Sequence, residues 1–221
     1  MLVCPDIADR NCETACACIL HDSKFAVCYM NFQMKRCPWP TSDDPLYLKY
    51  HDEEWGVPIH DDRKIYEFLV LEVFQAGLSW RTVLYKRENF RKAFAGFDFR
   101  KVAKFGARER SRLVRDAGII RNKAKIESAI NNANRFLEVR DEFGTFARYM
   151  WSWVGGKPIL HKLRTLKDYP AFTNEAVAWA KDLKNRGFKF LGPTVVYAHM
   201  QAVGMVNDHV IDCFRHRALR S

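Results

Sequence analysis

A carboxylate set among aromatic residues is the first feature of the sequence that could do chemistry. Glu72 lies in the stretch LVLEVFQAGLSW, residues 69–80. A buried carboxylate without a hydrogen-bond partner takes up a proton or destabilises the fold by roughly several kcal/mol. We therefore expect Glu72 to meet a donor, from the protein or from a ligand, in a sheltered place. At helical spacing it shares the stripe that a helix turns toward a core with Ile65, Phe68, Leu69, Val73 and Ala76.

The aromatic residues close to Glu72 in the sequence are Trp39, Tyr47, Tyr50, Trp55 and Trp80. Any one of them could simply belong to the core. Together they offer flat faces and polar rims, which a pocket for a base extruded from a nucleic acid requires. A purine amino group, or an electron-poor methylated purine, would supply the partner that Glu72 needs.

Two cysteines and two histidines form a second candidate site, with Cys37 and His51 near the beginning of the chain and His209 and Cys213 near its end. Two thiolates and two imidazoles make a closed tetrahedral zinc site without a coordination position for catalysis, so zinc here would join the two ends of the chain. In NDHVIDC, three residues separate the last two ligands, which would place both on one helical turn. The gap between Cys37 and His51 matches no common zinc-finger pattern, so buried cysteines beside polar histidines remain an alternative.

The other cysteines lie early in the chain, where no secretory signal is recognisable, and reduced thiols or metal ligands are therefore favoured over disulfides. A further ligand set can be assembled from Cys12, Cys16, Cys18 and His21, but no matching second half follows, which favours an extension with little fold of its own. His199 is interpreted as a helix histidine with satisfied hydrogen bonds rather than as a ligand.

The basic residues are concentrated in one quarter of the chain. Residues 81–135 hold sixteen lysines and arginines against five acidic residues, so this segment accounts for the whole net charge of +10. Such clustering is typical of a surface that meets a phosphate backbone, although solvated helix faces are the alternative. No apolar run approaches the length of a membrane span.

A helix pair within the basic segment could hold a phosphate. In RLVRDAGIIRNKAKIESAI, Gly118 can take a positive φ and let the backbone approach a ligand, while Arg121, Lys123 and Lys125 lie beside the free amides of the next helix. An ordinary helix turn is the alternative. The two helices would pack through Leu113, Val114, Ile126 and Ile130.

The elements that must position these residues follow from capping residues and helical periodicity. Few runs alternate with period two, so we predict a mostly α fold. We expect an N-terminal extension over residues 1–35, one domain over 36–215 and a C-terminal tail over 216–221. The expected helices span about 61–76, 79–94, 98–106, 108–117, 122–137, 145–154, 173–186 and 193–203.

Several long motifs occur in a fixed order, namely YLKYHDEEWGVP, LEVFQAGLSW, RDAGIIRNKAKI, KNRGFKFLGPTVVYAHMQAVGMVNDH and the closing Cys213. In these motifs the chain resembles the 3-methyladenine DNA glycosylase I family, the Tag type of the helix-hairpin-helix superfamily. The resemblance covers residues 36 to about 214. It implies a helix-hairpin-helix glycosylase fold whose two ends meet at a structural zinc.

The resemblance also implies a role for each candidate residue. Cys37, His51, His209 and Cys213 would bind zinc, and Glu72 would contact the edge of the flipped base. Tyr50 and Trp80 would stack on or border that base, and Trp39, Trp55 and Tyr47 would complete the pocket. Leu78 would wedge into the space that the base leaves, and Gly118 with its neighbours would hold the DNA.

The implied activity is hydrolytic release of 3-methyladenine from alkylated double-stranded DNA, which leaves an abasic site. After KIESAI the chain reads NNANRF, without the aspartate that many superfamily members carry there, so we expect a monofunctional enzyme without lyase activity. We expect a cytoplasmic monomer, active at the nucleoid, without an obligate protein partner. A noncatalytic DNA-binding module has no need of Glu72 beside aromatics, and a zinc hydrolase needs an open metal position.

Two departures from the family pattern stand out. The family normally begins a few residues before its first zinc cysteine, so Met34 resembles a start and residues 1–36 are hypothesised to result from a mis-assigned translation start. One extra residue lies between Cys37 and the Asp44-Pro45 pair, in the loop WPTSDDP. That insertion could shift Trp39 away from the pocket.

Overall fold

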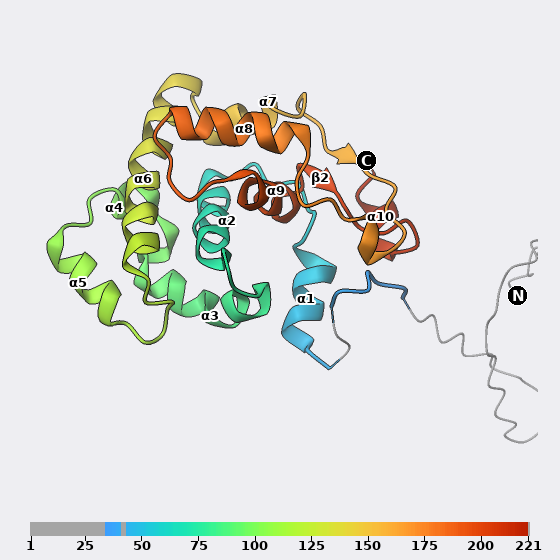
Figure 1. Ribbon diagram of the computed structural model, residues 1–221, viewed down its shortest axis with the longest axis horizontal. Helices are drawn as coiled ribbons and strands as arrows, with labels where there is room; N and C mark the ends of the chain where they lie inside the picture. The colour runs from blue at the N-terminus through green and yellow to red at the C-terminus, as the bar shows by residue number, and fades with distance from the viewer. Residues whose placement is uncertain (1–33, 41–42, 221) are drawn as a thin grey trace, which may run out of the picture. The chain divides into compact units, whose positions relative to one another are not determined.

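The computed structural model describes residues 34–40 and 43–220. The chain divides into two units, Met1–Lys35 and Arg36–Ser221, and the architecture below is that of the second. The expected mostly α fold is confirmed (Figure 1). Its helices are α1 (Pro45–Glu53), α2 (Asp62–Gln75), α3 (Trp80–Ala93), α4 (Phe99–Val102), α5 (Ala107–Arg115), α6 (Lys123–Phe143), α7 (Phe146–Ser152), α8 (Asn174–Asn185), α9 (Pro193–Ala202) and α10 (Phe214–Ala218), with 3-10 turns η1 (Ala95–Phe97) and η2 (Leu166–Asp168).

The helices begin where capping residues predicted them. Asp61, Ser79, Asn122 and Thr173 each accept a hydrogen bond from a backbone N–H three residues later, at the starts of α2, α3, α6 and α8. The sequence analysis missed α1, which is capped by Asp44 and has proline at its first position, and it missed the short helix α10.

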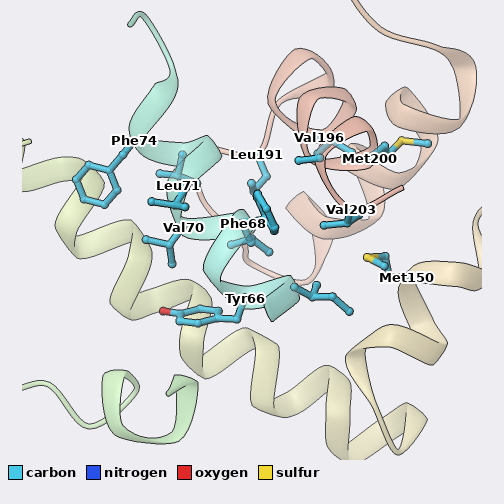
Figure 2. Close-up of a cluster of buried hydrophobic side chains, with 14 of the residues drawn as sticks. Tyr66, Phe68, Val70, Leu71, Phe74, Met150, Leu191, Val196, Met200 and Val203 are labelled. Carbon is cyan, nitrogen blue, oxygen red and sulfur yellow. The ribbon is translucent and has the colours of Figure 1, made fainter. Parts of the chain in front are cut away.

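Helix α2, which carries Glu72, lies at the centre of this unit. It packs against α3, α6, α7 and α9. Every residue from Ile65 to Phe74 is buried, so the expected single apolar stripe was too narrow a prediction. A helix enclosed by others on all sides buries its whole circumference. Figure 2 shows side chains of this core, among them Phe68, Leu71 and Phe74 of α2, Val196 and Met200 of α9, and Val203, which follows α9.

Helices α5 and α6 form the expected basic helix pair. Leu113 of α5 packs with Ile126 and Ile130 of α6, and all three are buried. Val114, which was predicted to share this contact, is 38% exposed instead of buried.

The segment that follows α9 returns to the region of α1. Strands β1 (Ile159–Leu160) and β2 (Val206–Asn207) form a parallel pair, with Ile159 opposite Val206. Gly204 lies so close to the backbone of Val57 that a Cβ atom would come within 2.4 Å of it, and its φ of +75° favours glycine. This close approach brings the two ends of the unit together. In the part of the chain that the structure describes, no helix combines the length and apolar character needed to cross a membrane.

Candidate active site and metal cluster

A cavity of about 270 Å³ opens beside α2. Its volume lies just below the range of roughly 300–1,000 Å³ that is usual for ligand pockets, so it suits one small, flat group. All six residues that the sequence predicted for a pocket line it, Trp39, Tyr47, Tyr50, Trp55, Glu72 and Trp80. The remaining wall is made by Gln75, Leu166, Tyr169, Ala198 and Gln201, which the sequence analysis did not single out.

The aromatic walls are rings held against one another. The Trp39 ring lies 5.0 Å from that of Trp55 and 5.1 Å from that of Tyr47, and the Tyr50 and Trp80 rings are 5.0 Å apart. These centroid distances are typical of packed aromatic pairs. The extra residue before Asp44 therefore leaves Trp39 in the pocket wall.

Glu72 brings an acid group into this apolar cavity. Its side chain is 4% exposed, and among the described residues it forms no ion pair with an arginine or lysine. Burial raises the pKa of Glu72 to about 8. The pKa of the nearby Tyr50 hydroxyl is also raised, first by burial and second by the negative charge of the Glu72 carboxylate. The pocket thus holds a carboxyl group that lacks a cationic partner.

A first prediction concerns the stability of Glu72→Gln. Between the ordinary pKa of 4.5 and the folded value of about 8, the unfolded chain ionises Glu72 while the folded chain keeps it protonated. The folded state of the parent therefore loses up to about 1.4 kcal/mol per pH unit in this window, and the glutamine variant does not. Urea unfolding gives the free energy of unfolding of both proteins at pH 5 and pH 8. Relative to the parent, the free energy of unfolding of Glu72→Gln should be higher at pH 8 than at pH 5 by a few kcal/mol. An equal difference at both pH values would contradict the assignment.

A buried hydrogen-bond network orients the opposite wall of the pocket. Asp208 accepts hydrogen bonds from Gln201 Nε2 at 2.7 Å and from the Tyr197 hydroxyl at 2.5 Å. His161 Nδ1 lies 2.6 Å from the same carboxylate, and this contact raises the pKa of His161. Because the amide nitrogen of Gln201 is engaged, its amide oxygen remains for the pocket.

The four predicted metal ligands converge on one point. The Nδ1 atom of His209 lies 3.4 Å from Cys37 Sγ and 3.5 Å from Cys213 Sγ, and His51 Nε2 lies 3.6 Å from Cys213 Sγ. All four residues are buried, and their ligand atoms lie within 4.8 Å of one another. In tetrahedral coordination with metal–sulfur bonds of about 2.3 Å and metal–nitrogen bonds of about 2.0 Å, sulfur and nitrogen are about 3.5 Å apart. The donor set therefore fits a tetrahedral metal ion.

The second nitrogen of each imidazole is also engaged. His51 Nδ1 lies 2.7 Å from the carboxylate of Asp52, which Arg36 holds in turn through bonds of 2.7–3.0 Å. His209 Nε2 lies 3.0 Å from the carbonyl of Trp55. Histidine ligands are usually oriented in this way by a carboxylate or a carbonyl. Hydrogen bonds from Cys37, His209 and His51 lower the pKa of Cys213, which favours the thiolate that metals bind.

The expectation that His209 and Cys213 share a helical turn was wrong. They lie in the loop between β2 and α10, where the Cys213 N–H donates to the carbonyl of Val210 and the His209 N–H donates to Asn207 Oδ1. The loop is irregular because local hydrogen bonds replace the helical ones. The ligand atoms still converge. The suggested set Cys12, Cys16, Cys18 and His21 lies outside the described residues.

The turn after α2 presents Leu78 to solvent, with 43% of its side chain exposed. Gly77 has a φ of +79°, which reverses the chain at small steric cost, and the Leu78 N–H donates to the carbonyl of Gln75 at 2.6 Å. The turn is therefore short and tightly held, and its tip is apolar.

The turn between α5 and α6 differs from its prediction in two ways. Gly118 does not take a positive φ, and its N–H donates to Asp116 Oδ1 at 2.8 Å. Limited space favours the glycine instead, since a Cβ atom would lie 3.0 Å from Asp116 Oδ1 and 3.2 Å from the side chain of Asn89. Lys125 is buried and turns inward, whereas Arg121 and Lys123 are exposed beside the first amides of α6.

Two further basic surfaces were not singled out as sites from the sequence. Arg108, Arg112 and Arg115 line a hollow on α5 next to the turn. Helices α8 and α9 form a second helix pair, and their connection exposes Phe190 in a left-handed conformation with a φ of +60°. Asn132 holds that connection through two hydrogen bonds to the backbone of Lys189.

The interpretation of His199 as a helix histidine outside the metal cluster is confirmed, but its ring was also expected to have satisfied hydrogen bonds. It lies in α9 and is buried, and within the described residues neither ring nitrogen has a partner in hydrogen-bond geometry. Burial lowers the pKa of His199 to about 3, against a smaller opposing effect of the Phe68 backbone. The ring is therefore neutral.

The geometry defines a mostly helical, basic protein with a sheltered aromatic pocket, an acid group inside it and a separate cluster of four metal ligands. The family model for methyladenine glycosylase matches residues 39–216. DNA-3-methyladenine glycosylase 1 of Escherichia coli is 49% identical over 180 residues, which is 81% of this chain and 96% of that protein. DNA-3-methyladenine glycosylase of Haemophilus influenzae is 43% identical over 178 residues, 80% of this chain and 96% of that protein.

Solved structures agree with these relatives. A crystal structure of 3-methyladenine DNA glycosylase I superposes with a TM-score of 0.79 at 47% identity, covering 81% of this chain and 98% of that one. A crystal structure of a variant 3-methyladenine DNA glycosylase I in complex with 3-methyladenine superposes with a TM-score of 0.79 at 37% identity, covering 82% of this chain and 97% of that one. The chain therefore belongs to the methyladenine glycosylase family and is a hydrolase of N-glycosyl bonds, which confirms the resemblance drawn from the motifs.

Proposed function

We propose that this enzyme binds alkylated double-stranded DNA, flips out 3-methyladenine and releases it by hydrolysis, leaving an abasic site. The observation that supports this most directly is the buried carboxyl group of Glu72 inside the aromatic pocket, which forms no ion pair among the described residues. A flat cationic purine would stack on or border the packed Tyr50 and Trp80 rings and present its amino group to Glu72. The names of the curated relatives and the 3-methyladenine-bound structure support the same base.

The reaction follows from the chemistry of the leaving group. Methylation at N3 makes adenine cationic and weakens its bond to the sugar, so the base departs as neutral 3-methyladenine. A pocket that binds the departing purine tightly favours the cleaved state. Water then adds to the sugar as positive charge develops there, and no covalent enzyme intermediate is needed. We assign Glu72 to the base and propose a monofunctional enzyme without lyase activity.

The metal cluster is assigned a structural role. Cys37, His51, His209 and Cys213 would hold one Zn²⁺, and four protein ligands leave it no open position for catalysis. Bound zinc supplies a cross-link between the loop before α1 and the loop before α10. Trp55 connects this cluster to the pocket, because its carbonyl meets His209 while its ring lines the cavity.

The basic surfaces are assigned to the DNA backbone. Arg121 and Lys123, beside the first amides of α6 at the end of the helix-hairpin-helix turn around Gly118, would meet phosphates without reading sequence. The arginines of the hollow on α5 extend the same positive surface. Leu78 at the tip of its turn would fill the space from which the base was removed.

The test of this function is chemical. Duplex DNA treated with a methylating agent is incubated with the protein, and the released bases are identified by chromatography and mass spectrometry. We expect 3-methyladenine in the supernatant and uncut, alkali-labile abasic sites in the DNA. Absence of any released methylated base would overturn the proposal, and strand cleavage without alkali would overturn its monofunctional part.

A second prediction concerns Leu78→Ala. Removing an exposed side chain leaves the fold intact, so the melting temperature should stay within about 1 °C. Without a wedge, the flipped base returns to the stack more readily, and excision from duplex DNA should fall by roughly fivefold to tenfold. The affinity for free 3-methyladenine should be unchanged. A matched control is Leu160→Ala, which truncates another exposed leucine, in β1 and outside the pocket, and should leave excision unaffected.

A further inference from the structure

Lys125 is a buried lysine in the most basic part of the protein. It is 6% exposed, although Arg121 and Lys123 nearby are exposed. Its ammonium group donates to the carbonyl oxygens of Phe74 at 2.9 Å and Ala76 at 2.5 Å. Burial lowers the pKa of Lys125. The charge is thus used inside the protein, whereas the sequence had predicted a phosphate contact for Lys125.

The two carbonyls that Lys125 meets belong to the C-terminal end of α2. The last carbonyls of a helix lack intrahelical partners and carry a partial negative charge. A lysine that donates to them satisfies their hydrogen bonds and neutralises that charge. The chain continues from Ala76 through Gly77 to Leu78, so Lys125 closes the helix of Glu72 immediately before the exposed turn.

Lys125 itself belongs to the start of α6, which faces the C-terminal end of α2 in this contact. It is the third residue of α6, and its own N–H donates to the capping side chain of Asn122 at 3.1 Å. One side chain therefore connects the start of α6, next to Arg121 and Lys123, with the end of α2. No other lysine within residues 34–40 and 43–220 is as buried as Lys125.

We propose that Lys125 is a positioning residue that holds the turn carrying Leu78 in register with the phosphate-binding end of α6. This inference rests on the proposed function. Phosphates gripped beside Arg121 and Lys123 fix where the duplex lies, and the Lys125 contact fixes where Leu78 enters it. The buried ammonium group also neutralises the partial negative charge at the C-terminal end of α2, which would otherwise repel the DNA backbone.

The test compares Lys125→Met with Lys123→Met, which removes an exposed charge from the same helix. Three quantities are measured for each, namely affinity for a duplex with a tetrahydrofuran abasic analogue over a series of NaCl concentrations, the single-turnover rate of 3-methyladenine release from methylated duplex, and affinity for free 3-methyladenine by tryptophan fluorescence. Lys123→Met should reduce the salt slope by about 1, as loss of a phosphate contact does. Lys125→Met should keep the parental salt slope and the affinity for the free base, while its release rate falls about tenfold.

Three results would overturn the proposal. A salt slope that falls by about 1 in Lys125→Met would make Lys125 a phosphate contact. Affinity for the free base that falls in proportion to the release rate would make it a support of the pocket alone, and an unchanged release rate would deny it any role in positioning. If Lys125→Met does not fold, Lys125→Gln, which keeps a donor without the charge, is measured in the same way and the same three results decide. A parent protein that releases no 3-methyladenine would instead refute the proposed function, while the salt slopes would still show whether Lys125 touches DNA.

Discussion

Glu72→Gln is expected to lower kcat/KM for release of 3-methyladenine by roughly 100-fold, because a hydrogen bond to a charged group contributes about 1.5–3 kcal/mol. The substitution keeps the size of the side chain and removes the charge that faces the cationic base. Burial raises the pKa of Glu72 to about 8, so the carboxyl group is protonated in the empty pocket at neutral pH. A cationic base beside it lowers this pKa again and favours the ionised carboxylate. Single-turnover rates on methylated duplex measure the loss.

The pH profile provides the stricter test of the same residue. In the free enzyme Glu72 is protonated below pH 8 and must lose its proton to meet the cationic base, so kcat/KM of the parent should rise with pH and level off near 8. This rising limb should disappear in Glu72→Gln. A parental rate that falls as pH rises through 8 would mean that the protonated acid is the active form, and it would reverse the assigned role.

The matched control for Glu72→Gln is Glu67→Gln. Glu67 is buried in the same helix, but it is paired with Arg87 at 2.7 Å and with Arg91 at 2.8 Å, and it does not line the pocket. Loss of the Glu67 carboxylate should destabilise the protein, because the buried Arg87 would lose one of its two carboxylate partners. The rising limb of the pH profile should remain. The two variants together separate loss of stability from loss of base binding.

Much of the candidate site could be predicted because its signals are local. Asp61, Ser79 and Asn122 identify helix starts through a hydrogen bond that spans three residues, and the structure confirms each of them. Glu72 was conspicuous because a carboxylate on an apolar stripe conflicts with burial, and such conflicts are expected at functional sites. The aromatic residues around it lie close in sequence, so α1, the segments on either side of it and the start of α3 bring them together.

What could not be predicted depends on long-range packing. Lys125 has the sequence context of a phosphate contact, and only the position of the end of α2, some fifty residues earlier, shows that its ammonium is used internally. Gln201 of α9 lines the pocket and donates to Asp208, and this pair forms only because the chain folds back after α9, which helical periodicity does not reveal. His199 lies in a predicted helix, but periodicity does not reveal that its ring would lack partners.

Removal of the metal should have the largest effect on stability. We expect one zinc per chain by atomic emission, and we expect it to be absent from His51→Asn. A structural zinc contributes folding free energy directly, and losing such a site places a variant among the most destabilised, at about 4 kcal/mol or more. For a domain of this size that corresponds to a fall in melting temperature of roughly 10 °C. His60→Asn is the matched control, because His60 is exposed, stacks on Trp151 at 4.9 Å and takes no part in the cluster.

The position of the cluster determines how this loss should reach activity. Metal release leaves α2, α3 and α6 packed in the core, but it frees the loops around Cys37 and His209, and with them Trp39 and Trp55 in the pocket wall. Hydrogen exchange after chelation should therefore accelerate first at residues 36–56 and 205–220, and affinity for free 3-methyladenine should fall before the core unfolds. Zinc added back to the chelated protein should restore both protection from hydrogen exchange and binding of the free base. The reason is that a metal with four protein ligands cross-links the two segments that carry them. If activity required zinc while hydrogen exchange was the same with and without the metal, the metal would instead be catalytic.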